Sequence, residues 1–185
     1  MTAGFRRQAE HELHRGVVVR LTRSTFTAPD GTTFDRDVVH TPDAVAVVPV
    51  DRGPDGGWEV VLVGQYRPAL DAVVLEIPAG MCDVDGEPSD STARRELEEE
   101  AGYRTGPTEL LTAFHPAPGF ATHRTEIRLA VGLEPVPRRA HGVEEHWMTV
   151  ERLALADALA RCTDGQITDA KTLIGLLLAA GRLTA

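Results

Sequence analysis

The feature that most constrains this chain is a run of glutamates, RELEEEAG, at residues 95–102. Pro88 lies where a helix commonly begins, and Gly102 lies where one commonly ends. We therefore expect a helix from Ser89 to Ala101. Like charges three or four residues apart repel one another along a helix, so this acidic segment needs either open solvent or positive charge around it.

Three of these glutamates, Glu96, Glu99 and Glu100, are spaced i, i+3 and i+4 and would share one helical face. Hard divalent cations prefer oxygen ligands, and bound cations of this kind can neutralise diphosphate oxygens and activate a water molecule. The simpler interpretation is a solvated acidic face without a ligand. The surroundings favour a metal site, because Gly80 ends a strand and starts a loop whose backbone could approach a phosphate.

Length, charge and cysteine content limit the class of protein. The 185 residues suit one domain with a single core, and a net charge of −9 argues against a duplex nucleic-acid partner. Cys82 and Cys162 are in no metal-ligand spacing and indicate a reduced compartment. No apolar run reaches the length of a membrane span, and the first residues do not resemble a signal peptide, so we expect a cytoplasmic protein with no membrane contact.

Short apolar runs separated by glycine and proline predict a mixed sheet with a few helices. We expect strands at 16–24, 32–39, 44–50, 58–66, 73–78, 109–116, 126–133 and 146–151, and further helices at 151–162 and 168–181. This order predicts an α+β fold, an α/β/α sandwich of mixed β-sheet. A β-hairpin extension at 1–40 precedes the main domain at 41–185.

The segment from Gly80 to Tyr103 resembles the Nudix box, in which a glycine, five residues, a glutamate and seven residues precede Arg-Glu-apolar-x-Glu-Glu-x-Gly-apolar. The matching residues are Gly80, Glu87, Arg95, Glu96, Leu97, Glu99, Glu100, Gly102 and Tyr103. Six residues separate Gly80 from Glu87 instead of five, which should lengthen a turn and leave the helix register intact. The resemblance implies a Nudix hydrolase that binds Mg²⁺ or Mn²⁺ through Glu96, Glu99 and Glu100, with Arg95 in a structural role.

Further segments resemble the ADP-ribose pyrophosphatase branch of that family. They are residues 65–67, 76–80, 118–120 and 165–172. The resemblance implies hydrolysis of ADP-ribose to AMP and ribose 5-phosphate, a metal ligand from the backbone carbonyl of Ala79, and a homodimer whose N-terminal strands reach the partner's site. The alternatives are another sugar nucleotide, a dinucleotide or a prenyl diphosphate as substrate, or a nucleotide-binding module with little turnover.

Four residues are candidates for substrate binding. The planar guanidinium groups of Arg67 and Arg36 suit a diphosphate, because each can donate paired hydrogen bonds to two oxygens. Phe34 could stack on a base, and Pro118 lies about where the branch carries a proline associated with substrate. The alternative roles are surface ion pairs for the arginines and simple packing for the phenylalanine.

Several residues are candidates for the general base that activates water. The branch carries an acid-rich loop that supplies the base, whereas residues 137–142 of this chain read PRRAHG. His123 also stands where the branch commonly has an acidic residue. Glu99, Glu145 and His123 are therefore the candidates for activating water, and a metal-bound hydroxide that needs no base is a further alternative.

Overall fold

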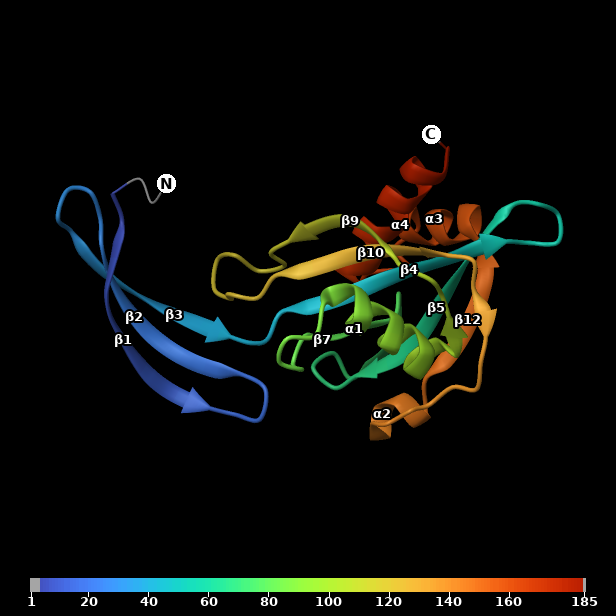
Figure 1. The fold of residues 1–185 in the computed structure, drawn as a ribbon. Coiled ribbons are helices and arrows are strands. Elements are labelled where there is room, and N and C mark those ends of the chain that lie inside the picture. The colour runs from blue at the N-terminus through green and yellow to red at the C-terminus, as the bar shows by residue number, and fades with distance from the viewer. Residues whose placement is uncertain (1–3, 185) are drawn as a thin grey trace. The chain divides into compact units, whose positions relative to one another are not determined.

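The computed structural model describes residues 4–184, and the backbone divides into two compact units. The smaller unit contains the chain up to Asp43 together with His115–Arg124. The larger unit contains Ala44–Phe114 and the chain from Thr125 onward. Figure 1 labels the elements of both units.

The smaller unit is built on a three-stranded antiparallel sheet in the order β1-β2-β3. Its strands are β1 (Arg6–Arg15), β2 (Arg20–Thr27) and β3 (Thr33–His40). The hairpin expected from the sequence is the β2–β3 pair, which turns at Gly31 with a φ of 89°. Strand β1 was not expected, because every residue in it is exposed and its polar sequence carries no alternation of apolar side chains.

The segment 115–124 lies along β3. The N–H of Val39 donates to the carbonyl of Phe120 at 2.7 Å, and the N–H of Thr122 donates to the carbonyl of Val39 at 3.0 Å. The side chain of Asp43 accepts a hydrogen bond from the N–H of Arg124 at 2.8 Å. These bonds attach a loop that is distant in sequence to the N-terminal sheet.

The larger unit is built on a seven-stranded mixed sheet with the order β12-β5-β4-β10-β9, in which β6 also pairs with β5 and β7 with β4. The strands are β4 (Ala44–Arg52), β5 (Trp58–Arg67), β6 (Ala72–Glu76), β7 (Ala79–Met81), β9 (Glu109–Phe114), β10 (Thr125–Val131) and β12 (Thr149–Ala154). Strands β10 and β4 run parallel. A separate two-stranded sheet pairs β8 (Tyr103–Arg104) with β11 (Glu134–Pro135).

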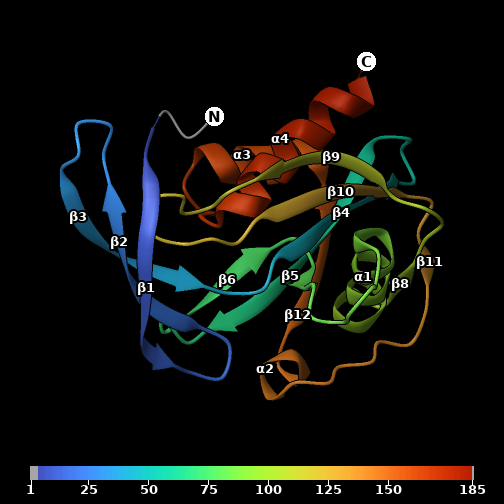
Figure 2. The ribbon, with the colours of Figure 1, turned by 60° about the vertical axis from the view of Figure 1, so that its left-hand side comes forward.

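Helices cover both faces of this sheet, so the predicted α/β/α sandwich is confirmed (Figures 1 and 2). On one face lie α1 (Ser89–Glu96) and the π-helix η1 (Leu97–Ala101); on the other lie α3 (Leu155–Thr163) and α4 (Ala170–Thr184). Successive residues of a strand face opposite sides. Accordingly, Val45 and Val47 pack beneath α1, and Val48 packs with α3 and α4.

One element differs from the expectation in a way that matters for the site. Residues 143–146 form a short helix, α2 (Val143–His146), and β12 begins only at Thr149. The expected strand at 146–151 therefore starts three residues too early, and Glu145 lies on a helical turn. Among the described residues, no helix is long and apolar enough to span a membrane.

Candidate active site

The glutamate helix changes its geometry inside the acidic motif. It is α-helical up to Glu96 and then forms a π-helical turn over Leu97–Ala101. Gly102 ends it with φ 72° and ψ 37°, a left-handed conformation that glycine adopts without steric cost. The expected helix from Ser89 to Ala101 is present with those bounds, and its last five residues are π-helical. The wider turn changes the directions of the later glutamates, and such π-turns occur frequently at functional sites.

Glu96 lies directly over Gly80, which belongs to β7 and does not start a loop as expected. A Cβ atom placed on Gly80 would lie 2.1 Å from Cδ of Glu96, so only glycine leaves room for this carboxylate. The Glu96 side chain is 12% exposed. Burial raises the pKa of Glu96 above its ordinary value, although the adjacent Arg95 opposes that shift.

Glu100 is the most deeply buried carboxylate of the motif. The residue is 4% exposed, and its Oε2 accepts a hydrogen bond from the N–H of Ala79 at 2.9 Å. Burial raises the pKa of Glu100 to about 8, and the negative charges of Glu96 and Glu145 add to the shift. Burial therefore raises the pKa of both Glu96 and Glu100, although Glu96 pairs with Arg95.

Arg95 connects three carboxylates of the motif. Its Nη1 lies 2.7 Å from Glu96 and 3.1 Å from Glu99, and its Nη2 lies 3.3 Å from Glu87. Oε2 of Glu87 also accepts a hydrogen bond from the hydroxyl of Thr92 at 2.7 Å. Arg95 therefore links Glu87, which precedes the helix, to the helix itself.

These residues fit a divalent cation by the chemistry of their donors. Glu96, Glu99 and Glu100 offer carboxylate oxygens, which are the ligands that Mg²⁺ and Mn²⁺ prefer. In residues 4–184 no three acidic, histidine or cysteine side chains are already gathered around one point. Because Arg95 bridges Glu96 and Glu99 here, binding of a cation between these two carboxylates requires the guanidinium to move.

The basic loop, residues 137–142, lies against the same helix. Nε2 of His141 lies 3.3 Å from Oε1 of Glu99, and the backbone N–H of His141 donates to Oε2 of Glu145 at 2.7 Å. Arg138 donates to the carbonyl oxygens of Met148, at 2.8 Å, and of Glu145. The loop therefore places α2 beside the glutamate helix, close enough for the charge of Glu145 to raise the pKa of Glu96.

The candidate His123 belongs to the smaller unit, whereas the glutamates belong to the larger one. Its backbone oxygen lies 3.2 Å from Nδ1 of His115. Its own Nδ1 is buried without a hydrogen-bond partner. His123 lies in the segment 115–124 of the smaller unit, which also contains Pro118.

Three of the four substrate-binding candidates line one pocket of the smaller unit. Phe34 stacks on Phe26 with ring centroids 5.6 Å apart and an interplanar angle of 20°. The guanidinium of Arg36 lies 4.8 Å from the centroid of the Phe34 ring, and Pro118 lines the same pocket. Arg7, which lies on the unexpected strand β1, also lines this pocket and has its guanidinium over Phe26.

Arg67, the fourth candidate, is part of a different pocket in the larger unit. Its Nε and Nη2 donate to the two carboxylate oxygens of Glu76 at 2.7 and 2.6 Å, and Lys171 also bonds to that carboxylate. Burial alone would raise the pKa of Glu76, but Arg67 and Lys171 bring it below its ordinary value. Lys171 was not among the candidate residues, although it lies in a segment that resembles the family.

Comparison with known proteins agrees with this geometry. The model of the NUDIX domain family matches residues 40–169. An ADP-ribose pyrophosphatase of Mycobacterium tuberculosis is 35% identical over 94% of this chain and 82% of its own length. An ADP-ribose pyrophosphatase of Bacillus subtilis is 34% identical over 89% and 86%.

Two further matches extend the comparison. A methanol dehydrogenase activator of Bacillus methanolicus is 35% identical over 89% of this chain and 86% of its own length. A solved structure described as an ADP compounds hydrolase superposes with a TM-score of 0.83 at 20% identity, over 97% of this chain and 94% of that one, which supports the fold. The chain therefore belongs to the Nudix family and is a hydrolase of diphosphate linkages related to the ADP-ribose pyrophosphatases.

Proposed function

We propose that this hydrolase cleaves ADP-ribose to AMP and ribose 5-phosphate, and that it requires Mg²⁺ or Mn²⁺. The relatives named ADP-ribose pyrophosphatase support the substrate. The observation that supports the metal requirement is the burial of Glu96 and Glu100, which raises the pKa of both carboxylates even though Arg95 pairs with Glu96.

The residues that would hold the cation are Glu96, Glu99, Glu100 and the backbone carbonyl of Ala79. A bound divalent cation supplies charge to neutralise diphosphate oxygens and lowers the pKa of a water molecule. The protein's part is to position the carboxylates. The N–H of Ala79 orients Glu100, whereas Arg95, which bridges Glu96 and Glu99, would move aside for the cation.

The smaller unit and the larger unit each offer groups suited to one part of this substrate. The Phe34 ring and the Arg36 guanidinium present a flat, cationic surface suited to an adenine base. Arg67 uses Nε and Nη2 for Glu76, which leaves its Nη1 for a phosphate oxygen. In this arrangement Glu76 fixes the plane of the Arg67 guanidinium.

The test is a panel of diphosphates with Mg²⁺, in which release of the phosphorylated products is measured. ADP-ribose should give the highest kcat/KM, and a chelator should abolish turnover. Phe34→Ala should raise KM by about tenfold, because stacking on an aromatic ring contributes about 1–3 kcal/mol. A higher kcat/KM for a dinucleotide, a prenyl diphosphate or another sugar nucleotide would overturn the substrate assignment, and tight binding without turnover would indicate a nucleotide-binding module.

We also propose that the protein is a homodimer in which the N-terminal strands contribute to the partner's site. The smaller unit exposes apolar side chains at the turn after β1, where Val17, Val18 and Val19 are 105%, 46% and 42% exposed. Contiguous exposed apolar residues are typical of an interaction surface. Light scattering should give a mass of about twice the 20.0 kDa of the chain, and a fully active monomer would contradict the proposal.

A further inference from the structure

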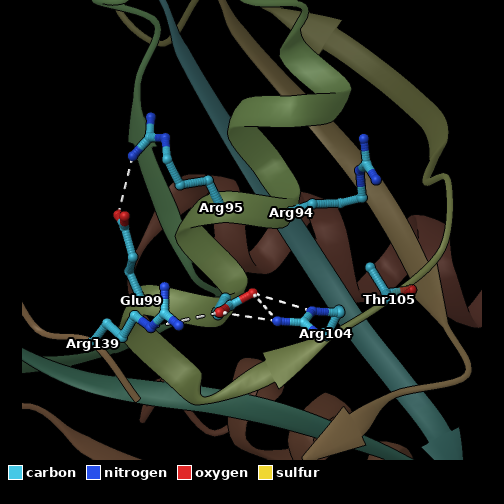
Figure 3. Close-up of a pocket in the computed structure, with 7 residues that line it drawn as sticks. Arg94, Arg95, Glu99, Arg104, Thr105 and Arg139 are labelled. Carbon is cyan, nitrogen blue, oxygen red and sulfur yellow. Dashed lines mark hydrogen bonds and ion pairs between the residues drawn. The ribbon is translucent and has the colours of Figure 1, made fainter. Parts of the chain in front are cut away.

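A third pocket, in addition to those lined by Phe34 and by Arg67, lies beside the glutamate helix. It is lined mainly by arginines. Figure 3 shows four of them around it, Arg94, Arg95, Arg104 and Arg139. Their acidic neighbours in the lining are Glu98 and Glu99. Four guanidinium groups therefore face two carboxylates, although the chain as a whole carries a net charge of −9.

The pocket opens on a different side of the helix from the buried carboxylates. Glu96 and Glu100 contact β7, through Gly80 and the N–H of Ala79. Glu98 instead accepts hydrogen bonds from Arg104 on β8 at 3.2–3.3 Å. This divergence follows from helix geometry, because residues two apart in the sequence do not face the same side of a helix.

Each carboxylate that lines the pocket has more than one basic neighbour. Glu98 lies within 4 Å of two guanidinium groups, since Arg139 approaches it at 3.9 Å in addition to Arg104 at 3.2 Å. Glu99 is shared between Arg95 and His141. At Glu98, two guanidinium groups therefore share one carboxylate.

Arg94 also lines the pocket and pairs with Asp90. Its Nε lies 3.1 Å from Oδ2 of Asp90 but is buried and makes no aligned hydrogen bond. The other oxygen of Asp90 already accepts hydrogen bonds from the N–H and the hydroxyl of Thr108 at 2.7 and 2.6 Å. Figure 3 shows Arg94 and Arg95 pointing in different directions from the helix, with Thr105 on the side of Arg94.

We propose that this pocket binds a phosphate group, either of free phosphate or of a nucleotide, at a site separate from the Glu96–Glu100 pair. A phosphate matches the forked donors of several arginines and would supply negative charge to Arg104 and Arg139, which share the carboxylate of Glu98. The side chains of Arg104 and Arg139 are 58% and 70% exposed, so both can turn toward an anion without breaking the core. Arg95 and Glu99 line this pocket and also contact the metal-binding motif. An anion bound here would therefore change the electrostatic potential at that motif.

The test measures binding of inorganic phosphate to the full chain by calorimetry, with a chelator present and no substrate. Arg104→Gln and Arg139→Gln should each weaken phosphate binding by about tenfold, the effect of losing a hydrogen bond to a charged group. Arg182→Gln is the matched control, because Arg182 is also 58% exposed and also pairs with one glutamate. Added salt should weaken binding to the wild-type protein.

A second arm replaces phosphate with AMP and identifies the source of the anion. Equal losses for phosphate and AMP support a site open to free phosphate, and losses confined to AMP support the phosphate of a nucleotide. Unchanged affinities in the Arg104 and Arg139 variants, or an equal loss in the Arg182 variant, would overturn the proposal. Because no turnover is measured, the result does not depend on ADP-ribose being the substrate.

Discussion

Glu100→Gln should lower turnover by more than about 100-fold, beyond what the loss of an outer-shell partner of a metal usually costs. Glutamine keeps the size of the side chain and can still accept the hydrogen bond from the N–H of Ala79. It removes the negative charge that would hold a divalent cation. Steady-state kinetics at saturating Mg²⁺ measures the effect, and a rate near that of the wild type would contradict the metal site.

The same substitution should stabilise the metal-free protein at alkaline pH. The pKa of Glu100 is raised from 4.5 to about 8, so folding favours the protonated carboxyl. This stabilisation is fully present below about pH 4.5 and is lost as pH rises through about 8, with a slope of at most about 1.4 kcal/mol per pH unit. Melting curves in a chelator should show this loss in the wild type and a smaller one in Glu100→Gln.

The control for that experiment is Glu109→Gln, since the Glu109 side chain is 48% exposed and pairs only with the exposed Arg182 in the ion pairs described for it. An exposed pair of this kind contributes about 0–1 kcal/mol, so its removal should leave the pH profile nearly unchanged. Identical profiles for the wild type and Glu100→Gln would mean that Glu100 is not the group that loses its proton in this range.

The sequence predicted the sheet and most of its helices because their apolar residues repeat with a clear period. Strands such as Ala44–Arg52 alternate between two buried faces. Strand β1 has no such signal, because all ten of its residues are exposed and its pairing with β2 depends on backbone hydrogen bonds. The hydrophobic pattern of the sequence therefore does not indicate a solvated edge strand such as β1.

The motif residues were predictable, but their geometry was not. Spacing along the sequence places Glu96 and Glu100 on one α-helical face, and it cannot distinguish an α-turn from a π-turn, which differ by one residue in the hydrogen-bond pattern. Arg67 illustrates a second limit. Its guanidinium group suggested a contact with phosphate. Only tertiary packing shows that Arg67 and Lys171 both pair with the carboxylate of Glu76.

The basic loop, residues 137–142, was expected to leave the site without its usual base. In the larger unit, Glu99 lies between Arg95 and His141. Glu145 on α2 accepts a hydrogen bond from the loop and interacts electrostatically with Glu96 and Glu100. This placement makes Glu145 the candidate base that we favour.

Glu145→Gln should therefore lower kcat by about 10²–10⁴-fold and leave KM nearly unchanged, which is the usual contribution of a general base. Glutamine can still accept the hydrogen bond from the N–H of His141, so the loop should keep its conformation. Glu144→Gln is the matched control, because Glu144 is the exposed neighbour on the same helical turn.

His123→Ala tests the competing assignment. If His123 were the base, this variant would lose the activity instead, and the rate of the wild-type enzyme would fall on the acid side as the imidazole becomes protonated. Full activity in both Glu145→Gln and His123→Ala, together with an inactive Glu99→Gln, would assign the role to the motif helix itself. A comparable loss in Glu144→Gln would point instead to Glu144 or to the overall charge of α2.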